Sequence, residues 1–199
     1  SHMRSLKEVH FLNRHKTIGS MNIEIEIKVS VPDLDKVREK LKALGTFVKK
    51  VQQKDTYYCP AHKDFFSQQP VIDFFRIREQ KGNVELAFHK RIDVGTPNAH
   101  VEEAEMVVGN ADIMKRILQN LDFVDKCVVD KTREYWDCGM FEVVLDEVKE
   151  LGTFVEVEVK EGSAREGLTM DDCLKFLKDN GIEYIEFIDK GYPEMCLGQ

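Results

Sequence analysis

Two segments of the chain alternate charged and aliphatic residues, Ile23–Lys28 and, far along the sequence, Glu156–Lys160. Side chains of a β-strand point alternately to the two faces, so in each segment the glutamates and the lysine share one face. A strand of this kind on its own is typical of a sheet with one solvated face. Neighbouring carboxylates are also the ligands that magnesium and manganese prefer, which gives the pattern a possible chemical role.

Basic residues lie on the strands predicted between these two segments. Arg76 and Arg78 follow Phe74-Phe75, so two guanidinium groups share one face within an apolar run. Unpaired charge away from water is costly, and charges of both signs on an enclosed surface must be compensated. A divalent cation with a polyphosphate satisfies such a lining, because carboxylates hold the metal and Arg and Lys hold phosphates. The acidic set is Glu24, Glu26, Asp146, Glu156 and Glu158, and the basic set is Lys28, Arg76, Arg78, Lys90, Lys131 and Arg133.

The composition excludes several classes of function. The 199 residues carry a net charge of −7, which argues against a nucleic-acid-binding surface spread over the fold. No segment approaches the roughly 18 apolar residues of a membrane helix, so we expect no membrane association. The five cysteines contain no C-x-x-C pair, which favours reduced thiols in a cytoplasmic protein.

Apolar spacing and turn residues predict three helices and about eight strands, mostly joined by short turns. The helices are expected between Pro32 and Gly45, from Asn110 through a stripe of Ile113, Ile117 and Leu121, and between Thr169 and Gly181. The strands are expected at 23–28, 47–59, 72–79, 84–92, 101–108, 127–137, 141–148 and 154–160, with a short additional strand within 182–188. Eight antiparallel strands can close into a barrel with room for a ligand.

We therefore predict an α+β fold, an eight-stranded antiparallel β-barrel with helices packed outside. If the helices cover the aliphatic faces of the strands, the charged faces line the interior. Residues 1–20 are expected to be a tag remnant and a flexible leader, and 21–199 a single domain.

At this point the ordered motifs resemble the CYTH superfamily of triphosphate tunnel metalloenzymes. The resemblance covers roughly residues 21–195 and is carried by the Glu-x-Glu-x-Lys strand, Arg76-x-Arg78, Lys131-x-Arg133 and the segment from Leu145 to Glu158. Gln53–Tyr58 is similar to the branch of class IV (CyaB-type) adenylate cyclases. Val101 and Phe88 depart from the pattern, in which arginine and threonine are common.

The resemblance implies a triphosphate tunnel, with Mg²⁺ or Mn²⁺ as cofactor and ATP or another triphosphate as substrate. By motif position Glu24, Glu26, Asp146, Glu156 and Glu158 would bind the metal, and Lys28, Arg76, Arg78, Lys90, Lys131 and Arg133 the phosphates. Lys28 and Asp146 are the candidate catalytic residues. The protein is expected to be a monomer or homodimer.

The activity itself stays open between two enzymes and a binding protein. The first alternative is a class IV adenylate cyclase, which converts ATP to cyclic AMP and pyrophosphate. The second is a triphosphatase acting on tripolyphosphate, thiamine triphosphate or a nucleoside triphosphate. The third is a non-catalytic polyphosphate-binding module. Tyr57, Tyr58 or Phe65 would stack on a purine in a cyclase, although aromatic residues at strand ends more often belong to the core.

Overall fold

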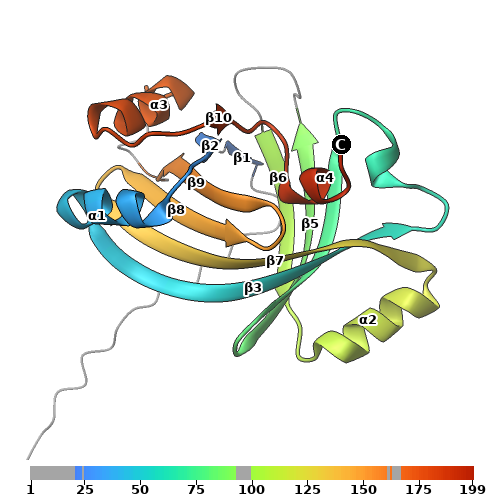
Figure 1. Cartoon of the computed structure of the whole chain (residues 1–199). Coiled ribbons are helices and arrows are strands. Elements are labelled where there is room, and N and C mark those ends of the chain that lie inside the picture. Colours follow the sequence, from blue (N-terminus) through green and yellow to red (C-terminus); the bar gives the residue numbers. More distant parts are fainter. Residues whose placement is uncertain (1–20, 24, 93–99, 161, 163–166) are drawn as a thin grey trace, which may run out of the picture.

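The computed structural model describes residues 21–23, 25–92, 100–160, 162 and 167–199. The expected leader and the predicted metal ligand Glu24 lie outside these residues. Within them the chain forms an antiparallel sheet of ten strands with helices on its surface (Figure 1). The strands are β1 (Met21–Ile23), β2 (Glu26–Ser30), β3 (Thr46–Pro60), β4 (Asp73–Gln80), β5 (Asn83–Ile92), β6 (His100–Val107), β7 (Phe123–Cys138), β8 (Phe141–Val148), β9 (Gly152–Val159) and β10 (Glu186–Phe187).

Four α-helices and one 3₁₀ helix accompany the sheet in the described part of the chain. They are α1 (Leu34–Leu44), η1 (Phe65–Ser67), α2 (Ala111–Asn120), α3 (Met170–Asp179) and α4 (Tyr192–Cys196). The predicted α+β class and antiparallel sheet are confirmed. The sequence did not predict the short C-terminal helix α4, and it placed the start of β7 four residues too late, at Cys127 instead of Phe123.

The sheet order is β1-β6-β5-β4-β3-β7-β8-β9-β2-β10, and β3 and β7 run as long curved strands across it (Figure 1). The two halves of the first predicted strand separate: β1 pairs with β6, whereas β2 pairs with β9. The sheet has ten strands where eight were expected, and within the described ranges its hydrogen-bonded ladder does not close the predicted barrel. Its distant members β6 and β9 are linked through the chain that joins β1 to β2.

The main apolar core lies between α1, α3 and the faces of β2, β8 and β9 that they cover. The apolar stripe predicted for α1 is confirmed, since Val37 and Leu41 are buried there. Burial of an aliphatic side chain stabilises the fold by roughly 1.5–3 kcal/mol each, so this layer fixes which sheet face turns outward. Its sheet residues include Ile27, Val29, Val143, Leu145, Val155 and Val157.

Helix ends follow the capping residues that the sequence indicates. Asp33 caps α1 by accepting a hydrogen bond from the Asp35 amide, and Asn110 caps α2 through the Ile113 amide. Gly45 ends α1 with extended backbone. A Cβ atom there would lie 2.2 Å from the carbonyl oxygen of Asp137, so close approach of β7 requires the glycine.

Helix α2 turns a different face to the sheet from the one that its apolar spacing predicts. Ile113, Ile117 and Leu121 are exposed, whereas Leu118 is buried and Met114 packs beside it. Residues 114 and 118 are four apart and therefore share one helix face, the one that meets Ile77 and Tyr58.

None of the helices in the described ranges combines the length and apolar character needed to cross a bilayer. The five cysteines are all free thiols.

Candidate functional site

The sheet face opposite α1 and α3, here called the inner face, carries most of the predicted charged residues. Directly paired residues of antiparallel strands point to the same face, so the strand register shows which residues lie on the inner face. Lys28 pairs with Glu156, and Arg133 pairs with Asp146. The face continues through further pairs to the other side of the sheet: Gln53 with Lys131, Asp55 with Arg78, Tyr57 with Arg76, Arg78 with Glu85 and His89 with Glu103.

Arg133 lies at the centre of a first charged cluster on the inner face. Its Nε donates to Asp146 Oδ1 at 2.7 Å, and its Nη2 donates to Asp146 Oδ2 and, at 2.8 Å, to Glu156 Oε2. The ammonium group of Lys28 is 3.4 Å from Glu156 Oε1. Tyr192 of α4 donates its hydroxyl to Asp146 Oδ2 at 2.7 Å, and its ring lies 4.2 Å from the Lys28 nitrogen.

Paired charge keeps this cluster ionised in spite of burial. Burial acts to raise the pKa of Glu156, yet the positive charges of Arg133, Lys28 and Lys131 lower this pKa to about 2. Burial acts to lower the pKa of Arg133, but Glu156 and Asp146 hold it well above its ordinary value. The Glu156 carboxylate and the Arg133 guanidinium group are therefore charged over the whole physiological range.

Asp55 is the centre of a second cluster. Its carboxylate accepts two hydrogen bonds of 2.7 Å from Arg78 and one of 2.7 Å from Lys131, and Arg76 lies 4.0 Å away. Asp55 is fully buried, and the Lys131 side chain is only 2% exposed. Burial lowers the pKa of Lys131 to about 8, although Asp55 acts to raise it. Against its own burial, Asp55 is held far below its ordinary pKa by Lys131 and Arg78.

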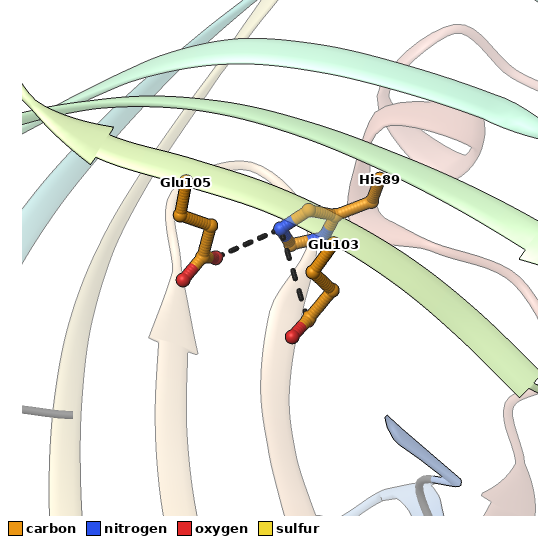
Figure 2. A group of neighbouring side chains, drawn as sticks. All are labelled: His89, Glu103 and Glu105. Atoms are coloured by element: carbon orange, nitrogen blue, oxygen red, sulfur yellow. Dashed lines mark hydrogen bonds and ion pairs between the residues drawn. The ribbon is translucent and has the colours of Figure 1, made fainter. Parts of the chain in front are cut away.

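A third group of charges extends the inner face over β5 and β6. Arg76 Nη1 donates to Glu85 at 3.0 Å, and its Nη2 lies 3.6 Å from Glu105. His89 reaches from β5 toward two glutamates of β6, Glu103 and Glu105, as Figure 2 shows. The inner face thus carries interleaved positive and negative groups from β2 to β6.

Glu26 and Glu158 form a direct pair between β2 and β9. Like charges directly opposite each other on one face destabilise a sheet, and a divalent cation held between two carboxylates offsets that cost. This donor set fits Mg²⁺ or Mn²⁺. Asp146 fits less well, because Arg133 and Tyr192 already engage both of its oxygens. Glu156 adjoins Glu158 on the inner face of β9, although Lys28 and Arg133 contact it.

Lys90 does not lie on the inner face, so the expectation that it belongs to the basic set there is wrong. It pairs with Asp73 and Glu102, and its side chain is exposed. Strand β5 is regular, so Lys90 shares the outer face with Val84, Leu86 and Phe88, and the odd-numbered residues Glu85, Ala87 and His89 lie on the inner face. The apolar residues at every second position of this strand already indicated which face Lys90 occupies.

Sequence reasoning missed Asp55, Tyr192 and His89 as residues of the site. Asp55 entered the sequence analysis only as part of the Gln53–Tyr58 motif. Alternation along this strand puts Asp55 on the same face as Gln53 and Tyr57, which could have indicated its place in the site. Tyr192 had no local signal, because only tertiary contact brings α4 to the inner face. His89 is the inner-face neighbour of the lysine that was chosen instead.

The three aromatic candidates for a purine contact are core residues. Tyr57 and Phe65 belong to one buried cluster with Val71, Val129 and Phe154. Tyr58 packs with Ile77 and Leu118 in another cluster. Tyr58 and Phe65 therefore face the apolar core, whereas Tyr57 is buried but lies on the inner face, opposite Arg76.

Comparison with known proteins places the chain in a family. The CYTH domain family matches residues 22–192. A protein of Methanocaldococcus jannaschii, named as a candidate adenylate cyclase, is 31% identical over 175 residues, which cover 87% of this chain and 98% of that protein.

Solved structures show the same fold. The PH1819 protein of Pyrococcus horikoshii has a TM-score of 0.71 at 27% identity, covering 88% of this chain and 98% of its own. A Hippeastrum protein, HpAC1, described as a candidate adenylyl cyclase with a dominant triphosphatase activity, has a TM-score of 0.61 at 20% identity, covering 86% and 92%. Together with the geometry of the inner face, the match over residues 22–192 shows that the chain belongs to the CYTH domain family.

Proposed function

We propose that this protein is a divalent-metal-dependent enzyme that cleaves a triphosphate bound on the inner face. The observation that carries the proposal is the convergence of five basic side chains from three strands, β2, β4 and β7, on that face, interleaved with carboxylates. These side chains are Lys28, Arg76, Arg78, Lys131 and Arg133. A polyanion with a metal ion matches such a surface in both signs of charge.

The basic residues act by exchanging partners. Arg78 and Arg133 each hold a carboxylate through two parallel hydrogen bonds, a geometry that a phosphate group reproduces. Lys131 and Arg76 flank the same Asp55 and supply further positive charge. A triphosphate replaces some of these carboxylate contacts, so its chain of phosphates is positioned by charges that are already arranged in space.

Glu26 and Glu158, with Glu156 beside them, are the residues that would hold Mg²⁺ or Mn²⁺. A metal ion bound there would neutralise the negative charge that develops on the phosphate oxygens during the reaction. Lys28 lies 3.4 Å from Glu156 Oε1, the carboxylate that Arg133 also contacts. From this position its ammonium group would contact a phosphate and stabilise the same developing charge.

Two reactions fit this arrangement. In the first, the ribose 3′-oxygen of ATP forms a bond to the α-phosphorus while the bond to the β-phosphate breaks, giving cyclic AMP and pyrophosphate. The name of the M. jannaschii relative favours this reaction. In the second, water forms a bond to the terminal phosphorus while the bond from this phosphorus to the bridging oxygen breaks, so that the diphosphate leaves and the terminal phosphorus ends as orthophosphate. Burial of Tyr58 and Phe65 in the apolar core, which removes two of the three expected purine contacts, favours the second, as does the activity described for the Hippeastrum protein.

The test is product analysis with the purified protein. ATP, tripolyphosphate and thiamine triphosphate are incubated separately with Mg²⁺ or Mn²⁺, and the products are resolved by anion exchange. Cyclic AMP with pyrophosphate supports the cyclase, and orthophosphate without cyclic AMP supports the triphosphatase. Absence of turnover with all three substrates overturns the proposal that the protein is an enzyme of this kind.

A matched pair of variants locates the activity. Glu158→Gln removes one carboxylate of the Glu26 pair and should abolish turnover, whereas Glu147→Gln changes an exposed glutamate on the neighbouring strand β8 and should leave it unchanged. Equal activity of the two variants contradicts the assignment of the metal to Glu158.

A further inference from the structure

One side-chain cluster on the inner face differs in chemistry from the carboxylate pair already described. His89 of β5 points between Glu103 and Glu105 of β6 (Figure 2). Its Nε2 atom lies 2.8 Å from Glu105 Oε1 and 3.8 Å from Glu103 Oε1. One ligand atom from each residue falls within 4.8 Å of the other two.

The β5–β6 ladder holds these three residues in place. His89 pairs directly with Glu103, and Glu105 pairs with Ala87, two positions away on the same face. The small side chain of Ala87 leaves room for the imidazole ring to lean along the strand toward Glu105. Arg76 Nη2 lies 3.6 Å from Glu105 Oε1, the oxygen that His89 also contacts, and helps to fix that carboxylate. Because two adjacent strands and an outer ion pair fix the donors, little rearrangement is needed to bring them onto one ion.

The spacing of the donors suits a small divalent ion. Zinc binds imidazole nitrogen and carboxylate oxygen at about 2.0–2.2 Å, so two donors of a tetrahedral site lie roughly 3.3–3.6 Å apart. The two distances from His89 Nε2, 2.8 and 3.8 Å, fall on either side of that range. Side-chain motions of about half an ångström convert the hydrogen bond to Glu105 and the longer contact with Glu103 into a shared ligand geometry, with the Nε2 lone pair replacing an N–H.

We propose that His89, Glu103 and Glu105 form a second metal site, selective for a divalent transition metal such as zinc. Imidazole nitrogen favours zinc, iron and nickel over magnesium, which takes oxygen ligands and keeps much of its water. The site therefore differs in metal preference from the carboxylate pair Glu26 and Glu158. The Glu103 side chain is only 6% exposed, so a metal held there is largely shielded from bulk water.

This site does not depend on the proposed triphosphate chemistry. Its three ligands come from β5 and β6, whereas the carboxylates assigned to magnesium come from β2 and β9. Failure of the enzyme assay therefore leaves it intact, and absence of zinc binding leaves the enzyme proposal intact.

The experiment measures metal binding directly. The protein is freed of metal with a chelator and titrated with Zn²⁺ by calorimetry in 5 mM Mg²⁺ (roughly the level that saturates a carboxylate site), and with Co²⁺ by visible absorption. Wild type should bind one equivalent of zinc that magnesium does not displace. His89→Ala and the larger His89→Gln should each lose that equivalent or weaken it by at least about 100-fold. The other histidines of the six in the chain remain in both variants, so the difference reports His89 alone.

Lys90→Ala and Glu158→Gln serve as matched controls. Lys90 adjoins His89 but lies on the opposite face, and Glu158 belongs to the carboxylate pair, so both variants should keep the zinc equivalent. Circular dichroism verifies that each variant is folded. Zinc binding that persists in both His89 variants, that is lost in Glu158→Gln, or that is absent from wild type overturns the proposal.

Discussion

Replacement of Asp55 by asparagine tests the electrostatic reasoning most directly. Asp55 is fully buried and accepts hydrogen bonds from Arg78 and Lys131, each at 2.7 Å. Asparagine keeps the shape of the side chain but removes the charge, so two buried cations lose their common partner. Breaking a buried ion pair on one side costs about 3–5 kcal/mol, because the remaining charge is left uncompensated. For a domain with a total stability of about 5–15 kcal/mol, this is a large loss.

Urea denaturation followed by tryptophan fluorescence measures the effect. The chain contains one tryptophan, Trp136, which is buried on β7, five residues from Lys131. Asp55→Asn should lower the free energy of unfolding by about 3–5 kcal/mol. Asp130→Asn is the matched control: Asp130 precedes Lys131 on β7 but is exposed, and its replacement should change stability by less than about 0.5 kcal/mol.

Addition of tripolyphosphate separates two roles of the same cations. If Arg78 and Lys131 bind phosphates, tripolyphosphate should raise the melting temperature of Asp55→Asn more than that of wild type, since no carboxylate competes for them. The reasoning is refuted if Asp55→Asn is as stable as Asp130→Asn, or if tripolyphosphate stabilises the Asp55 variant less than wild type.

Three other predictions follow from the inner face. The pKa of Lys131 is about 8, so this side chain loses its positive charge above that pH, and the affinity of the protein for tripolyphosphate should fall as pH rises through 8. In the variant Lys131→Arg the side chain stays charged, so the affinity measured by calorimetry should depend less on pH. The pKa of Glu156 is lowered to about 2 in the folded state, so the stability that this residue contributes is present above its unfolded pKa of about 4.3 and is lost as pH falls from there toward 2. Glu156→Gln should therefore reduce the acid dependence of the free energy of unfolding by roughly 3 kcal/mol. An unchanged acid denaturation curve would show that the ion pairs of Glu156 are not formed in solution. Arg78→Ala should weaken tripolyphosphate binding at least tenfold, whereas Lys90→Ala, on the opposite face, should not; equal weakening in the two variants would place Lys90 at the site after all.

Most of the strands and helices could be predicted from the spacing of apolar and charged residues in the sequence. Alternation in Ile23–Lys28 and Glu156–Lys160 assigned their glutamates to one face, and the register of β2 with β9 confirms that the two faces coincide. Apolar spacing, with Pro32 and Gly45 as bounds, located α1 to within one residue. The same alternation places Lys90 on the face of Val84 and Leu86, which conflicts with the phosphate contact predicted for it from its charge and from the family pattern.

Tertiary contacts decided what alternation does not encode. The division of the first strand between β6 and β9 depends on sheet closure, which no local pattern in Met21–Ser30 specifies. The rotation of α2, which exposes Ile113 and Ile117, depends on how Leu118 fits the strands beneath.

The sequence by itself determined which residue types share each strand face, because side-chain direction has a period of two along any strand. Only the tertiary structure decided which side chains form ion pairs and hydrogen bonds with each other on the inner face. Asp55 meets Lys131 across 76 positions of sequence, and Tyr192 meets Asp146 across 46. Such contacts depend on strand register and on the docking of α4, both set by the packing of the whole chain.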